Sequence, residues 1–240
     1  MTRFPDITLH YFDIRGRGQF LRALLHHRNI PFQDERIVLK ADNSNWPEIR
    51  KDRNTSGQFQ KLPALQWDKL MLNETLVILD FLQEQMGDNA HLSEQERPRH
   101  SMLTSSAYLD LMRPCIDLIW SDIFYPGTNV PATTAFMKWR IEMHLATVNQ
   151  TLEEWDWLNG LPERPVMASD AVLWEALDML RLTFDDHISF EELDALAGFY
   201  DDCPGAATFK QLLAEKHLNI TGRPGEAEAL IIIHNSLAES

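Results

Sequence analysis

The most constraining feature of this sequence is a strand-like run that ends in two aromatic residues and leads into a basic turn. Residues 5–12, which end in the run ITLHYF, alternate well enough for a β-strand, with Ile7, Leu9 and Tyr11 on one face. The turn that follows, residues 13–18 (DIRGRG), precedes apolar residues at the spacing of an amphipathic helix. Backbone N–H groups and the dipole at a helix N-terminus favour an anion. A phenol at this place, that of Tyr11, can donate a hydrogen bond to a negatively charged group. The alternative for an aromatic pair at the end of a strand is the hydrophobic core.

The pattern of the whole chain predicts two domains joined by a short polar linker. The first 87 residues read as β-α-β followed by β-β-α, with a second strand over 32–39, a hairpin over 63–72 and a helix from Thr75 to Met86. The linker is expected at 88–97, and residues 98–240 form the second domain. Its helices are expected near 93–122, 131–158, 168–184, 190–201 and 205–217, and Pro114 should kink the first of them.

Composition excludes several classes of protein. The net charge is −14, whereas nucleic acids and anionic membranes reward basic surfaces, so neither is expected as a partner. No apolar run approaches the length of a membrane span, and the N-terminal residues lack an apolar targeting core, so a cytoplasmic protein is expected. Cys115 and Cys203 are far apart in sequence, and the nine histidines show no metal-ligand spacing. We expect no metal.

Three motifs in the first domain give a more specific indication when they are taken in order. They are Asn45 to Arg50 (NWPEIR), Lys61 to Leu65 (KLPAL) and Asn73-Glu74-Thr75 at the start of a helix. Together they resemble the cytosolic glutathione transferases, and within them the sigma class and its mu, alpha and pi relatives. The resemblance covers residues 5–86 well and 98–215 more loosely. It implies an α/β thioredoxin-like N-terminal domain plus an all-α C-terminal helical domain.

The resemblance assigns the chemistry to Tyr11 and Arg17. A free thiol with a pKa of about 8.5 is mostly protonated at neutral pH, and a hydrogen bond to the thiolate form lowers that pKa. Tyr11 would supply this bond to glutathione, and Arg17 would add positive potential near the sulfur. The alternative for Arg17 is a solvated residue at the start of a helix, and Arg15 is closer to that alternative.

The same resemblance implies the glutathione-binding residues. Thr75 would offer its hydroxyl and backbone N–H to the γ-glutamyl carboxylate, and Glu74 would accept a bond from the neighbouring ammonium. An ordinary helix cap is the alternative for this pair. Leu62, before a cis Pro63, would pair through its main chain with the cysteinyl unit of glutathione.

A further group resembles the residues that hold the glycyl carboxylate of glutathione. Trp46, Arg50 and Lys61 make up this group. The loop from Lys51 to Gln60 is longer than in the sigma class. Arg50, Lys51 and Arg53 therefore compete for the position of the base, and the sequence does not decide among them.

The helical domain matches the family less sharply. Asp170 resembles the acid of a buried capping box, although Met167 stands where Ser or Thr is expected at the cap. The second-substrate pocket would be lined by Phe12, Ile14, Tyr108 and Met112. The alternative for these aromatic and methionine side chains is the hydrophobic core.

The function implied by the resemblance is that of a transferase for detoxification. It would conjugate the glutathione thiolate to a hydrophobic electrophile, with glutathione as a substrate and no metal. The resemblance also implies a homodimer, formed between the small domain of one chain and the helices near 93–122 of the other, although no acid donated by the partner is evident. Two alternatives stay open: a non-catalytic ligand-binding or structural member, and an isomerase or peroxidase that uses glutathione.

Overall fold

The computed structural model describes residues 5–40, 43–125, 131–159, 161, 163–216, 220–221, 223 and 225–238. The N-terminal residues 1–4, which lack a targeting core in sequence, lie outside this range. The first part contains four strands and four helices: β1 (Ile7–Phe12), α1 (Gln19–His27), β2 (Gln33–Ile37), α2 (Trp46–Lys51), α3 (Arg53–Ser56), β3 (Ala64–Trp67), β4 (Leu70–Asn73) and α4 (Thr75–Gln85).

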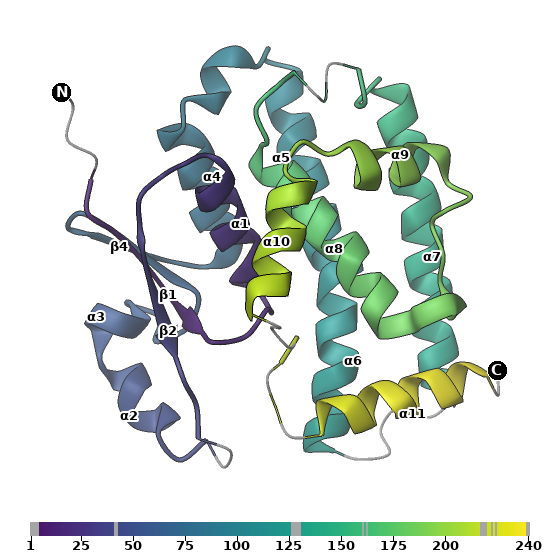
Figure 1. The fold of residues 1–240 in the computed structure, drawn as a ribbon, viewed down its shortest axis with the longest axis horizontal. Helices are drawn as coiled ribbons and strands as arrows, with labels where there is room; N and C mark the ends of the chain where they lie inside the picture. Colours follow the sequence, from purple (N-terminus) through teal and green to yellow (C-terminus); the bar gives the residue numbers. More distant parts are fainter. Residues whose placement is uncertain are drawn as a thin grey trace.

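The described remainder of the chain is helical. In order, its elements are the 3₁₀ turn η1 (Asp88–His91), α5 (Glu96–Ser106), the π-helical segment η2 (Ala107–Met112), α6 (Arg113–Phe124), α7 (Pro131–Glu154), α8 (Ala168–Phe184), the 3₁₀ turn η3 (Asp185–His187), α9 (Asp194–Asp202), α10 (Ala206–Lys216) and α11 (Glu226–Ala238). Figure 1 shows the sheet at one side of the molecule and these helices at the other. The predicted fold class is confirmed.

The four strands form a mixed sheet in the order β2-β1-β3-β4. β1 runs parallel to β2, and α1 supplies the crossover that parallel neighbours require. β1 is antiparallel to β3, with Leu9 opposite Leu65, and β3 and β4 form the predicted hairpin. This order places the end of β1 in the middle of the sheet, beside the end of β2. The turn after Phe12 therefore starts next to the segment that leads into α2.

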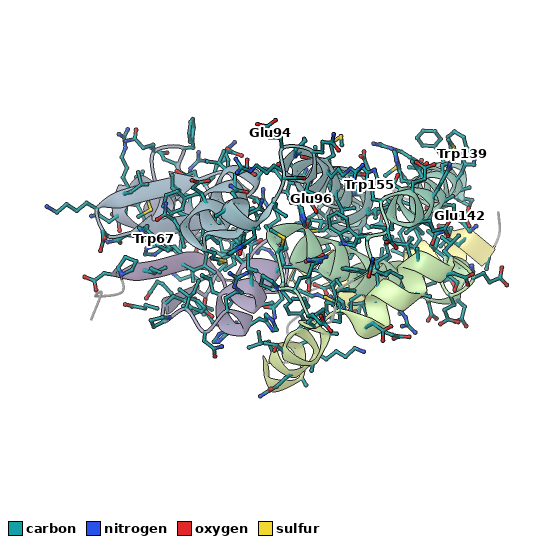
Figure 2. The ribbon with its side chains drawn as sticks, turned by 90° about the horizontal axis from the view of Figure 1, so that it is seen from above. Trp67, Glu94, Glu96, Trp139, Glu142 and Trp155 are labelled. Carbon is teal, nitrogen blue, oxygen red and sulfur yellow. The ribbon has the colours of Figure 1, made fainter. Side chains whose placement is uncertain are left out.

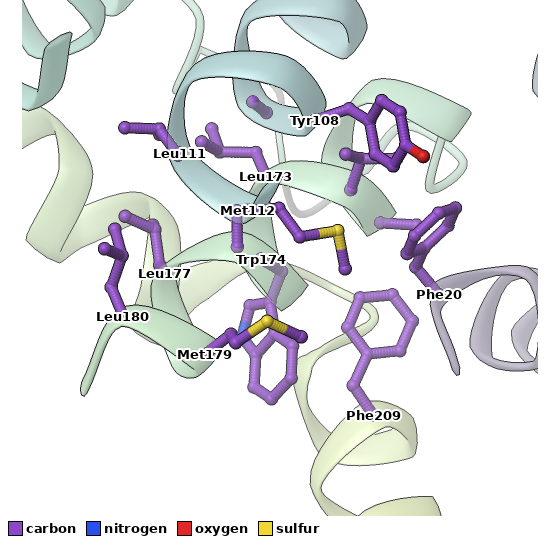
Figure 3. Close-up of a cluster of buried hydrophobic side chains, with 14 of the residues drawn as sticks. Phe20, Tyr108, Leu111, Met112, Leu173, Trp174, Leu177, Met179, Leu180 and Phe209 are labelled. Carbon is purple, nitrogen blue, oxygen red and sulfur yellow. The ribbon is translucent and has the colours of Figure 1, made fainter. Parts of the chain in front are cut away.

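A continuous hydrophobic core joins the sheet side to the helical side. Phe20 of α1 packs edge-on against Tyr108, with ring centroids 6.4 Å apart, and both belong to the cluster that contains Met112 and Trp174 (Figure 3). Burial of such side chains is favourable by about 25 cal/mol per Å² of apolar surface. Since α1 contributes to this shared core, the turn between β1 and α1 is held against the helical part.

The helical run near 93–122 is interrupted by a π-helical segment. Residues 107–112 are π-helical, and Pro114 lies in the first turn of α6, directly after them. Proline has no N–H to give to the preceding turn, and a wider turn removes the need for that donor. A π turn also changes the angular positions of the residues that follow. Side chains after Met112 therefore face directions that a uniform α-helical period does not predict.

Helix α11 was not predicted, although its isoleucines are evident in the sequence. Ile233 is fully buried, and α11 packs on α6, α7 and α8. The predicted contact from Asp170 is present: the Met167 N–H donates to Asp170 Oδ2 over 2.9 Å. Within the described ranges, no helix combines the length and the apolar character needed to cross a membrane. A search of the same residues finds no group of three or more His, Cys, Asp or Glu side chains arranged for a metal ion.

Candidate functional site

Two adjoining cavities lie at the end of β1, between the sheet and the helical part. The larger has a volume of about 490 Å³ and the smaller about 220 Å³. Four residues line both of them: Phe12, Ile14, Arg17 and Trp120. The turn after β1 therefore forms the common boundary of one composite site.

Tyr11 forms part of the wall of the smaller cavity. Its side chain is almost fully buried, and its hydroxyl oxygen accepts a hydrogen bond from the Arg17 backbone N–H over 2.8 Å. The turn approaches the ring so closely that a Cβ added at Gly18 would lie 2.2 Å from Tyr11 Cδ1. Burial raises the pKa of Tyr11, and the nearby Arg17 charge opposes this only in part. A phenol that stays protonated can donate its own hydrogen to an anion in the cavity.

Arg17 is positioned by the two tyrosines next to it. It lines both cavities, and its charge interacts electrostatically with the side chains of Tyr11 and Tyr108. The structure thus places the charge of Arg17 beside the phenol, as the sequence predicted.

Arg15 is the residue of this turn that sequence reasoning underrated. It is buried, and it forms ion pairs with Glu175 (Nε to Oε1, 2.5 Å) and Asp178 (Nη2 to Oδ2, 2.5 Å) of α8. The Tyr200 hydroxyl donates to the other oxygen of Asp178 over 2.6 Å. These partners are about 160 residues away in sequence, so no local pattern indicates them. They fasten the turn that carries Arg17 to the helical part.

The peptide bond before Pro63 is cis, as predicted. Leu62 lines the larger cavity, and within the described residues its main-chain N–H and C=O have no hydrogen-bond partner. An extended ligand can therefore pair with this edge of main chain in the manner of an added strand.

Asn73 fixes the loop that precedes Leu62. Its Nδ2 donates to the carbonyls of Ser56 (3.0 Å) and Lys61 (2.9 Å), and its Oδ1 accepts from the Phe59 N–H. Gly57 packs against it so closely that an added Cβ would lie 2.1 Å from Asn73 Oδ1. Sequence reasoning treated Asn73 only as part of a motif and missed this role.

Positive charge surrounds the larger cavity. Its lining includes the cations Arg17, Lys40, Lys61 and Arg223, and Asp13 is the one carboxylate among its described lining residues. Trp46 also lines it.

The three competing bases of the α2–α3 segment do not take part in this lining. Arg50 is exposed and lines neither cavity, so its place in the site stays a prediction. Lys51 pairs with Glu48 over 2.8 Å, and Arg53 is also exposed and outside the lining. α2 presents Trp46 to the cavity and directs the later bases outward. Lys40, which sequence reasoning missed, contributes a cation from the segment after β2.

Glu74 and Thr75 lie at the start of α4, but Glu74, and not Thr75, occupies the N-cap position. Glu74 is the capping residue and has a left-handed backbone (φ 66°), whereas Thr75 is the first helical residue and is buried. Thr75 therefore does not cap the helix. The Glu74 carboxylate lies 3.4 Å from Lys61 Nζ, but neither Glu74 nor Thr75 lines the two cavities. A non-glycine residue with positive φ at this place marks a strained helix start.

The four residues predicted for the second-substrate pocket lie in two different places. Phe12 and Ile14 line both cavities, but Tyr108 and Met112 are buried in the core and line neither (Figure 3). The side chains that face the smaller cavity come from one to two turns later, at Ile116 and Trp120. Tyr108 and Met112 belong to the π-helical segment itself, whereas Ile116 and Trp120 follow it on α6.

A segment before α11 completes the site. The Gly16 N–H donates to the Ile220 carbonyl over 3.0 Å, next to Tyr11. The Glu226 carboxylate accepts from the N–H groups of Ile220 and Thr221, each at 2.8 Å, and from the Thr221 hydroxyl at 2.6 Å. Thr221 and Arg223 line the larger cavity. The sequence carried no signal for this contact, because it joins residues more than 200 positions apart.

Comparison with known proteins agrees with this arrangement. Residues 7–84 match the family model described as the N-terminal domain of glutathione S-transferase. Haematopoietic prostaglandin D synthase from Homo sapiens is 33% identical over 78 residues, and glutathione S-transferase 1 from Ascaris suum is 28% identical over 116 residues. These alignments span 35% and 52% of the two curated relatives, and 32% and 48% of this chain.

Solved structures resemble the chain over almost its full length. The pi-class glutathione S-transferase of Onchocerca volvulus has a TM-score of 0.67 at 20% identity, covering 91% of this chain and 100% of that protein. A glutathione S-transferase of Caenorhabditis elegans has a TM-score of 0.68 at 16% identity, covering 88% and 97%. At these identities the likeness concerns the fold.

Proposed function

Since the chain belongs to the cytosolic glutathione S-transferase family, we propose that it joins the thiolate of glutathione to a hydrophobic electrophile, with Tyr11 stabilising the thiolate. The observation that carries this proposal is the buried phenol of Tyr11, whose pKa is raised by burial, at the wall of a site with cationic lining residues. Family resemblance alone would leave open whether the reactive site is intact.

The proposed mechanism depends on the turn between β1 and α1. Tyr11 donates its hydroxyl hydrogen to the sulfur, while Arg17 raises the potential around it, so the pKa of the thiol falls and the thiolate forms at neutral pH. The sulfur lone pair then forms a bond to the electrophilic carbon. With an aryl halide the carbon–halogen bond breaks and the halide leaves with its electron pair. Positioning and charge stabilisation account for the rate enhancement.

Glutathione is proposed to lie along the sheet side of the larger cavity. The main chain of Leu62 pairs with the cysteinyl unit, and the cations Lys61 and Lys40 beside Trp46 attract the glycyl carboxylate. Glu74 and Thr75, at the strained start of α4, are proposed to receive the γ-glutamyl end. Both lie outside the cavity lining, so this last assignment requires the peptide to extend past Lys61.

We propose a homodimer in which each site is built almost wholly from one chain. Exposed apolar side chains occur on both surfaces that the sequence assigned to the interface: Phe59, Leu70 and Val77 on the sheet side, and Met102 and Leu109 on α5 and η2. Apolar exposure on two surfaces that can pair about a two-fold axis favours closed association.

A second candidate is an isomerisation that uses glutathione without consuming it. It is favoured by the likeness of residues in the first domain to a prostaglandin D synthase. Parallel assays with an aryl halide, an isomerisable substrate and a peroxide separate this candidate from conjugation.

The decisive experiment compares wild type with Tyr11→Phe. We expect the variant to bind glutathione within a few-fold of wild type, while the pKa of the bound thiol rises by about one unit or more, equivalent to about 1.4 kcal/mol. Thiolate absorbance of the complex against pH measures this shift, and turnover of an aryl halide should fall in parallel. An unchanged titration with full turnover would remove Tyr11 from the mechanism.

A further inference from the structure

The start of the turn between β1 and α1 is held by a buried arginine of α1. Arg22 is 1% exposed, and its guanidinium donates from Nη2 to the Phe12 carbonyl over 2.9 Å and from Nη1 to the Ile14 carbonyl over 2.8 Å. These two carbonyls lie on either side of Asp13, where the chain leaves the strand. One side chain therefore fixes the direction in which the chain turns after Tyr11.

The charge of Arg22 is balanced by a carboxylate of β2. Its Nε donates to both side-chain oxygens of Asp34, at 3.0 and 3.1 Å, and Asp34 also accepts from Arg36 Nε over 2.6 Å. Arg36 in turn pairs with Asp13 over 2.8 Å. A buried cation needs such a partner, because an unpaired charge in the interior is strongly unfavourable. Arg22 can therefore stay charged while it is buried, and the planar fork of its remaining N–H donors is directed at the turn.

The same guanidinium lies beside the phenol on which the proposed reaction depends. The Arg22 Cζ is 5.6 Å from the centroid of the Tyr11 ring. Burial raises the pKa of Tyr11, and the charges of Arg17 and Arg22 oppose this rise. A phenol whose ionised form is favoured by neighbouring cations is a stronger hydrogen-bond donor, so it stabilises a thiolate more effectively.

Arg22 is separated from the cavities by the turn that it binds. It does not belong to the described lining of either cavity, whereas Phe12 and Ile14, whose carbonyls it binds, line both of them. An effect of Arg22 on the reaction must therefore pass through the turn and through Tyr11. Loss of such a residue should change the chemical step and leave the binding of glutathione nearly unchanged.

We propose that Arg22 is a positioning residue of the site: it fixes the turn that directs Tyr11 at the sulfur, and it places a second cation, in addition to Arg17, beside the phenol. This inference rests on the proposed function, because it concerns the same phenol and the same thiolate. Arg22 takes no part in the bond changes. Its contribution lies in how well Tyr11 donates its hydrogen to the sulfur.

The test measures the pKa of the glutathione thiol bound to Arg22→Gln, from thiolate absorbance against pH. We expect this pKa to rise by about 0.5–1 unit, because the phenol loses a neighbouring cation and its fixed orientation. Below that pKa, kcat for an aryl halide should fall by about three- to tenfold, in proportion to the fraction of thiolate, while the KM for glutathione stays within about threefold of wild type. Arg22→Lys keeps the charge but cannot span both carbonyls, so it should recover part of the loss.

Two further variants separate positioning from general damage. Arg28→Gln is the matched control, because Arg28 lies at the other end of the same helix and donates to the Val166 carbonyl (3.0 Å) and to Asp88 (2.7 Å), both outside the turn. It should leave the pKa of the bound thiol within about 0.3 unit of wild type. In a Tyr11→Phe background, Arg22→Gln should add less than about 0.3 unit, because its effect passes through Tyr11. An equal shift in Arg28→Gln, or the same shift with and without Tyr11, would overturn the inference.

A failure of the proposed function would be recognised separately, in protein free of glutathione. Labelling with 3-fluorotyrosine gives each tyrosine a fluorine NMR signal, and the signal of Tyr11 is the one that is absent in Tyr11→Phe. Arg22→Gln and Arg22→Lys should move this signal, and Arg28→Gln should leave it in place. If wild type does not ionise glutathione but the signal moves, only the proposed function is overturned. A Tyr11 signal that stays unmoved in folded Arg22→Lys would overturn the inference, even if Arg22→Gln does not fold.

Discussion

At the scale of single residues, the side chain with the most consequences for the site is Asn73. Its amide joins β4 to the loop that leads to Leu62, through the carbonyls of Ser56 and Lys61. Asn73→Ala should destabilise the protein by about 1–3 kcal/mol, because buried carbonyls lose their donor. Asn73→Asp should lower the stability by at least as much, because a carboxylate oxygen, which cannot donate a hydrogen bond, would then face both carbonyl oxygens. Urea unfolding measures the loss of stability. Calorimetry under conditions where the variants are folded should show that they bind glutathione more weakly than wild type.

Gln66→Ala provides the comparison, because the Gln66 amide donates to the exposed Asp68 carbonyl of its own hairpin. It should change stability by less than about 0.5 kcal/mol. Equal effects of the Asn73 and Gln66 variants on glutathione binding would contradict the anchoring role of Asn73.

Sequence reasoning succeeds at this scale where the signal is local. Phe12, Ile14 and Trp46 line the cavities as predicted, and Pro63 is cis. Arg15 and Asn73 were missed or underrated, because their partners come from distant parts of the chain. A side chain that acts through partners 12 to 163 residues away produces no periodic pattern in a single sequence.

At the scale of elements, the turn between β1 and α1 is limited by its glycines. The backbone of Gly18 touches the Tyr11 ring, and a Cβ there would lie 2.2 Å from it. Gly18→Ala should therefore displace the phenol and destabilise the protein by about 1–3 kcal/mol, the usual range for overpacking. Turnover should fall even under conditions where the variant is folded, as checked by circular dichroism and an aryl halide assay.

Gly198→Ala is the matched control for this substitution. Gly198 lies inside α9, and its added Cβ would meet only the end of the Leu158 side chain, at 3.3 Å. Alanine is favoured over glycine in a helix by about 0.5–1 kcal/mol, so this variant should be neutral or more stable. Loss of turnover in Gly198→Ala would show that the assay responds to general perturbation.

Elements with strong periodicity were predicted well, and those that depend on tertiary contacts were not. The hairpin and α1, α4, α7 and α8 follow from apolar spacing. The π-helical segment does not follow from apolar spacing: it directly precedes α6, whose first turn contains Pro114. Tyr108 and Met112 lie within this segment, whereas Ile116 and Trp120 of α6 line the smaller cavity.

At the scale of the whole molecule, pH should affect stability through His100. It is buried against Ser169, with Nδ1 to Oγ at 2.7 Å, and burial lowers its pKa to about 4. Its pKa in the unfolded chain is about 6.5. The folded state therefore binds fewer protons than the unfolded state in this interval, so stability is full above pH 6.5 and is lost as the pH falls towards 4.

The loss of folding stability at low pH should reach about 3 kcal/mol at most, and His100→Gln should abolish most of this pH dependence. Urea midpoints of both proteins at pH 7 and pH 5 measure the effect. A wild-type drop that persists unchanged in the variant would assign the pH dependence to other groups.

Association is the second property at this scale. The proposed dimer should have twice the single-chain mass of 27.8 kDa in sedimentation equilibrium at micromolar concentration. Phe59, 64% exposed on the sheet side, is the most exposed apolar side chain of the proposed interface, so Phe59→Ser should shift the equilibrium towards monomer. Leu182→Ser, on α8 outside the interface, should not.

A monomeric wild type would refute the proposed dimer, and sigmoidal glutathione binding to a dimer would refute independent sites. α7 carries further exposed apolar side chains, including Trp139, which Figure 2 shows at the outer edge of the helical end. A Phe136→Ser variant that dissociates the dimer would move the interface to α7.

The ion pairs of Arg15 have a consequence for attempts to recombine this protein with its relatives. The charge sits in one half of the chain and both of its neutralising carboxylates sit in the other, on α8. A chimera that takes residues 5–87 from this chain and its helices from another would be left with a buried, uncompensated cation unless the donor supplies acids at the positions of Glu175 and Asp178. Two relatives with the same fold can therefore exchange these halves only if the helical half carries acids that neutralise the buried Arg15.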